Sequence, residues 1–159
     1  MPGPLAGLLD VVTGDPALLS ALDAAGRGSA ELDLTAPAGM RPFVVAALAR
    51  RTGCPVLAVT ATGREAEDLV AALGSLLDSD RVALFPSWET LPHERLSPRA
   101  DTVGRRLAVL RRLAHPSPDD GPDADPATGR IDVVVAPVRS LLQPQVRGLG
   151  ELEPVALVQ

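Results

Sequence analysis

Three apolar runs of strand length are the feature that most constrains the fold of this chain. They read Val56-Leu57-Ala58-Val59, Val82-Ala83-Leu84-Phe85 and Ile131 to Ala136, and segments with helical periodicity separate them. Continuous apolar runs are typical of parallel strands that are covered on both faces. Strands that alternate with helices favour a parallel sheet with helices packed on both sides. We therefore predict an α/β fold.

Start signals for two helices are visible in the sequence. Asp15 precedes Pro16, which pairs an N-cap residue with a proline at the first helical position. Thr62 and Glu65 have the spacing of a capping box. Residues 31–35 form a further short candidate strand, and we expect the helices before it to pack on the side of the sheet.

A proline-rich stretch, residues 85–101, follows the second apolar run. Its three prolines exclude a regular helix, and a loop of this length in a compact domain usually has a function. The lone Trp88 suits either a buried anchor for the loop or a stack with a nucleic-acid base, and we expect the anchor. Asp101 is expected to cap a helix that ends near Ala114. The predicted apolar face of that helix comprises Val103, Leu107, Leu110 and Ala114.

Arginines are concentrated around this loop and the helix after it. Residues 81–115 contain seven arginines and three acidic residues. A solvated helix face accounts for most of them, and a docking surface for a partner is the alternative. Direct DNA contact is less favoured, because no aromatic residues alternate with the arginines.

The segment from Leu34 to Arg41 occupies the place of a phosphate-binding loop, which has the pattern G-x-x-x-x-G-K-[ST] in nucleotide hydrolases. When the two are aligned on Gly39, Leu34 replaces the first glycine, Met40 the lysine and Arg41 the hydroxyl residue. The chain contains no lysine at all. We therefore predict a degenerate P-loop domain of the RecA-like, helicase-type class that holds no nucleotide, and we interpret Gly39 as a turn glycine.

Candidates for catalysis and metal binding are weak. Glu89 and Glu94 are a carboxylate pair without a nearby nucleophile, so surface charge is the preferred interpretation. His93, His115 and Cys54 lack zinc-site spacing. We expect no catalytic residue, cofactor or metal, and we expect Cys54 to be a buried, small apolar residue.

Bulk composition indicates a cytoplasmic globular protein. The net charge is −5, which does not favour nucleic acid as a partner of the whole chain. A single cysteine excludes an intrachain disulfide and fits a reducing compartment. No apolar run reaches the roughly 18 residues of a membrane span, and the N-terminus lacks the basic region of a secretory signal.

The proline-rich stretch also carries a family resemblance. The order W-E-T-L-P, then S-P, then an aspartate that opens an arginine-bearing helix, resembles the N-terminal part of bacterial transcription-repair coupling factors. That part is similar to the excinuclease B protein, and the match extends over about residues 35–159. The motif residues, which the resemblance implies are structural, are Trp88, Glu89, Leu91, Pro92, Ser97, Pro98, Asp101 and Arg106.

The resemblance implies a function for a longer parent protein. The parent would be an ATP-driven DNA translocase that releases stalled RNA polymerase and recruits nucleotide excision repair. ATP and magnesium would act in motor domains that come later in the parent protein. RNA polymerase and DNA would also be contacted by later domains. The excinuclease A protein would bind mainly through a domain that begins near the end of this chain. No membrane partner is implied, and the first domain of the family has lost its nucleotide motif.

On this interpretation the chain is a fragment with three parts. Residues 1–30 form an N-terminal helical segment, and residues 31–146 form the degenerate P-loop domain with a flexible insert at 115–130. Residues 147–159 begin a second, partner-binding domain. Two alternatives stay open at this point. The chain is either part of an active nucleotide hydrolase or helicase of the excinuclease-B kind, or a free-standing α/β binding domain.

Overall fold

The computed structural model of the protein has an α/β architecture built on a parallel sheet, as predicted. It describes residues 3–28, 31–90, 97–117 and 128–152. Within them, three parallel strands lie in the order β1-β3-β2, and Val133 of β3 pairs with Val56 of β1 and with Val82 of β2. The strands are β1 (Val56–Thr60), β2 (Val82–Leu84) and β3 (Val133–Pro137).

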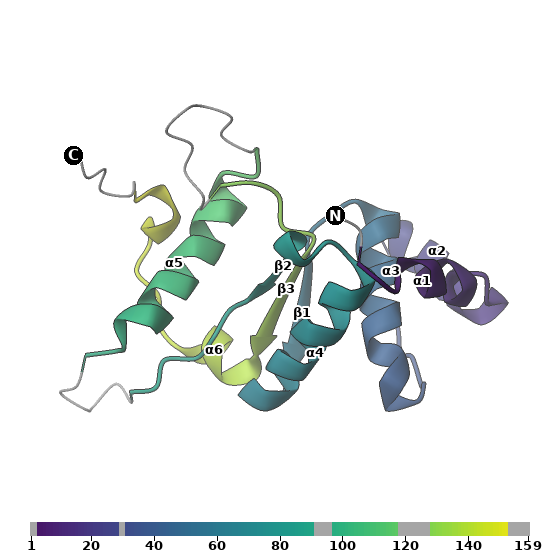
Figure 1. Ribbon diagram of the computed structural model, residues 1–159, viewed down its shortest axis with the longest axis horizontal. Coiled ribbons are helices and arrows are strands. Elements are labelled where there is room, and N and C mark those ends of the chain that lie inside the picture. The colour runs from purple at the N-terminus through teal and green to yellow at the C-terminus, as the bar shows by residue number, and fades with distance from the viewer. Residues whose placement is uncertain (1–2, 29–30, 91–96, 118–127, 153–159) are drawn as a thin grey trace.

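Helices cover both faces of this sheet. Figure 1 shows the layers edge-on, with α5 (Ala100–Ala114) on one side and α3 (Arg41–Thr52) and α4 (Gly63–Leu76) on the other. Alternate side chains of β3 point to opposite faces of the sheet. Val133 and Val135 belong to the core under α3 and α4. Val134 and Ala136 belong to the core under α5. The continuous apolar run of β3 thus reflects burial on both sides.

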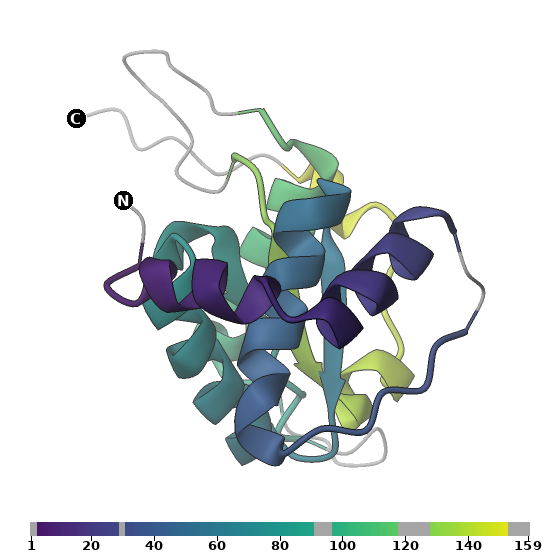
Figure 2. The same ribbon diagram turned by 90° about the vertical axis from the view of Figure 1, so that its right-hand side faces the viewer.

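The N-terminal helices form an additional layer. Helices α1 (Ala6–Thr13) and α2 (Pro16–Gly26) cross the outer surface of α3, as seen in Figure 2, and α1 also contacts α4. Leu9 and Leu22 are buried in the same cluster as the sheet residues. These helices therefore pack on the helical layer, whereas the sequence predicted packing beside the sheet.

The helix caps predicted at Asp15 and Thr62 are confirmed. The carboxylate of Asp15 accepts hydrogen bonds from the backbone N–H groups of Ala17 and Leu18 at 3.0 and 2.9 Å. The Thr62 hydroxyl accepts one from the N–H of Glu65 at 3.2 Å. The Glu65 carboxylate accepts a hydrogen bond from the N–H of Ala61, the residue before the cap, and so also ties the chain that enters α4 to its first turn.

The predicted strand at residues 31–35 is wrong. Residues 31–37 have no regular secondary structure and lead through a short 3-10 turn, η1 (Ala38–Met40), into α3. Leu32 and Leu34 remain 42% and 54% exposed. Two poorly buried leucines contribute too little to hold a strand against its loss of conformational entropy.

Three further local predictions are wrong in whole or in part. Asp101 does not cap α5: Arg99 occupies the N-cap position, and Asp101 lies in the first turn, where it forms an ion pair with Arg99 at 3.2 Å. Of the predicted apolar face of α5, Leu110 packs against the core, but the buried residues of this helix are Thr102, Arg106 and Val109, because it packs on a polar loop as well as on the sheet. Cys54 is exposed, since it follows the end of α3.

Two of the remaining described elements follow β3. They are α6 (Val138–Leu142) and the 3-10 turn η3 (Leu149–Glu151), which packs on α5. The third, the 3-10 turn η2 (Ser79–Arg81), precedes β2. Leu91 and Pro92, most of the predicted insert at 115–130 and residues 153–159 lie outside the described residues. Within the described ranges, no helix combines the length and apolar character needed to cross a membrane.

Candidate functional site

Arg106 is the centre of the contacts between α5 and the loop after β2. Its side chain is 1% exposed, and its guanidinium carbon lies 4.1 Å from the ring centroid of Phe85 and 4.2 Å from that of Trp88. One nitrogen of the group, Nη1, donates a hydrogen bond to the carbonyl of Pro86. The flat guanidinium suits this place because it stacks on aromatic faces and donates in its own plane.

The charge of Arg106 is buried without an acidic partner among the described residues. Its Nε and Nη2 atoms are buried and make no hydrogen bond. Burial lowers the pKa of Arg106 below its ordinary value, but an arginine stays protonated at neutral pH. The two rings and the Pro86 carbonyl therefore offset part of the desolvation cost. A solvated face is expected for most of the arginines of this segment, and Arg106, one of the motif residues, is a buried exception.

Glu89 ties the same loop to the start of α5. The buried hydroxyl of Thr102 donates a hydrogen bond to the Glu89 carboxylate. That bond is the main reason why the pKa of Glu89 is lowered from 4.5, and backbone hydrogen bonds add to it. An ionised carboxylate close to a helix N-terminus is also favoured by the helix dipole. Glu89 is thus an acceptor at neutral pH and lacks the raised pKa of a general acid.

Gln143 holds the backbone of Trp88. Its side-chain oxygen accepts from the Trp88 N–H at 2.7 Å, and its side-chain nitrogen donates to the Trp88 carbonyl at 3.2 Å. Gln143 directly follows α6, so this pair of bonds joins the loop to the end of α6. We call the whole set the Trp88 node: Phe85, Pro86, Trp88, Glu89, Thr102, Arg106 and Gln143.

The structure brings together only some of the motif residues. Trp88, Glu89 and Arg106 meet in the node, whereas Asp101 pairs with exposed Arg99 and takes no part in it. Ser97 and Pro98 lie just before α5. Thr102 was missed as a node residue, although its position four residues before Arg106 places both on one helix face. No sequence pattern links Gln143 to Trp88, because the two residues are 55 positions apart and meet only through the fold.

A cleft of about 410 Å³ opens beside the node. It lies beyond the carboxyl ends of the strands, where open parallel sheets commonly bind ligands. Its charged groups are Glu67, Glu89 and Arg139. Within the described residues, no three metal-ligating side chains gather, and no nucleophile lies hydrogen-bonded to a base in this cleft. The complete lining is Ala61, Thr62, Gly63, Glu67, Leu84, Pro86, Ser87, Trp88, Glu89, Pro137 and Arg139.

The predicted remnant of a phosphate loop lines a different cleft, of about 760 Å³. Leu34 and Arg41 border it together with Glu65 and the end of β1, whereas Gly39 and Met40 lie in η1 and do not line it. The Glu65 carboxylate already accepts a backbone N–H. This cleft therefore offers one arginine, opposed by a carboxylate, where a phosphate loop would offer a lysine and a row of N–H groups.

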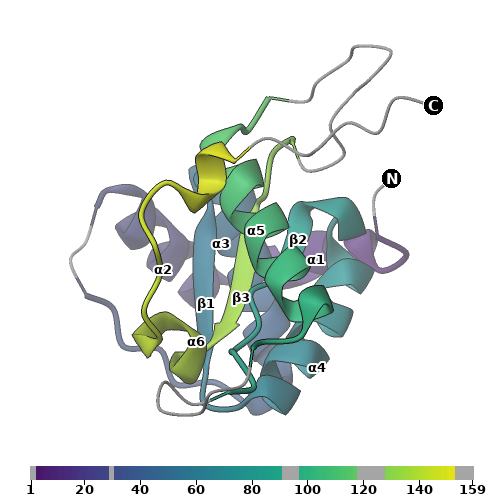
Figure 3. The same cartoon turned by 90° about the vertical axis from the view of Figure 1, so that its left-hand side faces the viewer.

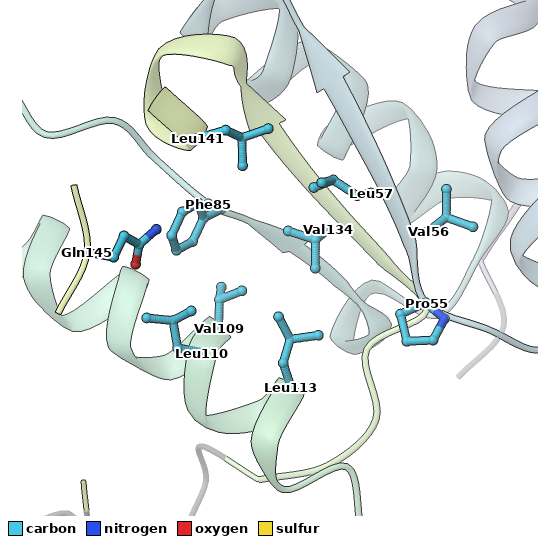
Figure 4. A pocket seen from close by; sticks show the side chains of 10 residues that line it. All are labelled: Pro55, Val56, Leu57, Phe85, Val109, Leu110, Leu113, Val134, Leu141 and Gln145. Atoms are coloured by element: carbon cyan, nitrogen blue, oxygen red, sulfur yellow. The ribbon is translucent and has the colours of Figure 1, made fainter. Parts of the chain in front are cut away.

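An apolar groove of about 260 Å³ runs between α5 and the sheet. Figure 4 shows side chains of β1, β3 and α5 converging on it. Among the described residues, α5 is the long helix on this face, and Leu57 of β1 is 54% exposed. Gln145 supplies the one polar side chain of the lining. The other lining residues are Pro55, Val56, Leu57, Phe85, Val109, Leu110, Leu113, Val134 and Leu141.

Comparison with known proteins finds similar sequences that share one protein name. No family model matches this chain. Proteins named transcription-repair-coupling factor from Mycobacterium tuberculosis and Mycobacterium bovis are each 53% identical to it over 154 residues, which is 97% of this chain and 12% of the relative. One of the same name from Haemophilus influenzae is 42% identical over 55 residues, 35% of this chain and 5% of the relative. The chain thus spans about 12% of the length of the mycobacterial relatives.

Proposed function

Because this chain is homologous to the N-terminal region of bacterial transcription-repair coupling factors, we propose that it is a non-catalytic interaction module of such a factor. The observation that carries the proposal is the 53% identity over 97% of the chain. A similarity of this extent includes the loop and helix of the Trp88 node as well as the sheet.

The chemistry of the clefts supports a module without catalysis. The described residues of the cleft beside the node hold carboxylates and one arginine but no hydroxyl that is hydrogen-bonded to a base, and the cleft at Leu34 and Arg41 lacks a lysine. We interpret the fold as a degenerate P-loop domain that kept the sheet and lost the phosphate-binding groups. In this interpretation the Trp88 node stabilises the surface on which partners are held.

The function of the longer protein is part of the same proposal. It would be an ATP-dependent DNA translocase of the cytoplasm that displaces stalled RNA polymerase and recruits nucleotide excision repair. ATP and magnesium would act in its motor domains, and later domains would contact RNA polymerase and DNA. The excinuclease A protein would be its repair partner, bound mainly through the domain that begins near residue 147. The relatives are named transcription-repair-coupling factor, and this name supports the assignment.

A chimera tests the proposal. In the M. tuberculosis relative, the aligned 154 residues are replaced by this chain or deleted, and two activities are measured on purified protein. We expect the chimera to keep both ATP-driven release of stalled RNA polymerase and strand-specific repair. The deletion should keep polymerase release and lose the repair preference. Loss of ATP hydrolysis by the deleted protein, restored by this chain, would contradict a non-catalytic role.

A further inference from the structure

The segment after α6 returns along the α5 side of the molecule. Figure 3 shows it rising from α6, beside β1, to the end of α5, where η3 lies. Its first residue, Gln143, is hydrogen-bonded twice to the backbone of Trp88. Residues 144–148 are exposed, and Val146 is 74% exposed. The segment is therefore held at its two ends and has little contact between them.

The far end is held by a close approach of backbones. A Cβ atom on Gly150 would lie 2.9 Å from the carbonyl oxygen of Leu110 and 3.2 Å from the Cβ of Ala114. The first distance is shorter than real Cβ contacts allow, and its partner is backbone that cannot swing aside. Only glycine therefore lets η3 rest on α5 in this position.

Polar contacts add to this end of the segment. Arg111 donates to the carbonyl of Leu152 at 2.8 Å, and His115 Nε2 lies 3.5 Å from a carboxylate oxygen of Glu151. The Glu151 side chain is 71% exposed, and exposed ion pairs contribute little to stability. The seating of Gly150 against Leu110 and Ala114 is thus the main fixed point.

We propose that residues 143–152 form a strap, clamped at Gln143 and able to detach at Gly148–Leu152, that covers part of α5 and of the apolar groove. Leu110 lines the groove and also lies under Gly150, and Gln145 of the strap forms one wall of the same groove. Detachment uncovers Leu110 and Ala114 and removes that wall. The chain turns at Gly148, where φ is +84°. The strap therefore opens locally, without unfolding of the rest of the chain. This proposal does not depend on the proposed function.

Limited trypsin digestion of the whole chain tests the strap, because Arg147 lies within it. Gly150→Ala is compared with Gly104→Ala, a matched control on α5 whose added Cβ meets no heavy atom within 4 Å. We expect cleavage after Arg147 to be roughly tenfold faster in Gly150→Ala than in the control, because overpacking opposes the docked state. Cleavage after Arg64, inside α4, should be equal in both. Equal cleavage after Arg147, or a parallel rise at Arg64, would overturn the proposal.

A second measurement uses the unaltered chain and does not depend on any variant folding. Cleavage after Arg147 and after Arg64 is followed at increasing urea concentrations below the unfolding transition. The proposal predicts that cleavage after Arg147 responds weakly to urea, because a local opening exposes little surface. If both sites show the same steep dependence, the strap opens only when the whole chain unfolds, and the proposal is wrong.

Discussion

The guanidinium carbon of Arg106 lies 4.2 Å from the centroid of the Trp88 ring, on a helix that begins twelve residues after that tryptophan. This contact joins the first part of the loop after β2, which the structure describes up to residue 90, to α5. The cation is fully buried, and in the described part of the chain no carboxylate pairs with it. Arg106 thus serves as a flat packing group whose charge is offset by two aromatic faces and one carbonyl.

Arg106→Ala is predicted to lower the free energy of unfolding by about 2–4 kcal/mol, through a cavity between two rings and the loss of their contact with a cation. The matched control is Arg105→Ala, because Arg105 is the exposed neighbour on the same helix and its loss should change stability by less than about 0.5 kcal/mol. Urea unfolding of the three proteins, followed by circular dichroism, measures the difference. Similar stabilities of the two variants would show that the stack contributes nothing.

Arg106→Lys tests whether the flat group is needed or only its charge. A lysine keeps the charge but cannot stack on both rings, so we expect it to cost more than about 1 kcal/mol of unfolding free energy. Urea unfolding again provides the measurement. Stability equal to that of the unaltered chain would indicate that charge alone suffices.

Gln143→Ala is predicted to loosen Trp88. The substitution removes both bonds to its backbone, at a cost of about 1–2 kcal/mol if the freed groups stay shielded from water. Trp88 is the single tryptophan of the chain, so its fluorescence reports on this position directly. Acrylamide should quench the variant more strongly than the unaltered protein. Gln145→Ala, two residues further along, is the control and should leave the quenching unchanged.

The pair of Glu89 and Thr102 predicts a pH dependence. The pKa of Glu89 is lower in the folded chain than its ordinary 4.5. Its contribution to stability is therefore complete above about pH 4.5 and is lost as the pH falls through the folded value. Thr102→Val removes the main hydrogen bond, so the melting temperatures of the variant and the unaltered chain should differ at about pH 7 and converge as the pH falls below about 4.5 and through the folded pKa of Glu89. A difference that stays constant over this range would show that ionised Glu89 is not involved.

The layers of the fold were predictable because apolar periodicity and capping signals are local. The runs at Val56, Val82 and Val133 became the three strands, and Asp15 and Thr62 cap helices. Local signals failed where tertiary contacts decide. The sequence around Arg106 does not show whether its side chain faces water or packs between two aromatic rings.

The node could be predicted only in part for the same reason. Trp88, Glu89 and Arg106 were singled out through a motif, but the partners Thr102 and Gln143 depend on how α5 and α6 approach the loop. The failed strand at residues 31–35 has a related cause. Its alternation of polar and apolar residues is correct for a strand, yet Leu32 and Leu34 find little burial beside β1.

Calorimetric titration of the chain with ATP and magnesium tests the central claim, that this module does not use nucleotide, most directly. Gly39→Ala is the matched variant, since an added Cβ there meets no heavy atom within 4 Å and the fold should tolerate it. We predict no binding heat up to about 1 mM nucleotide and no release of phosphate by either protein. Binding tighter than about 1 mM that the Gly39 variant loses would contradict the account and favour an active nucleotide hydrolase.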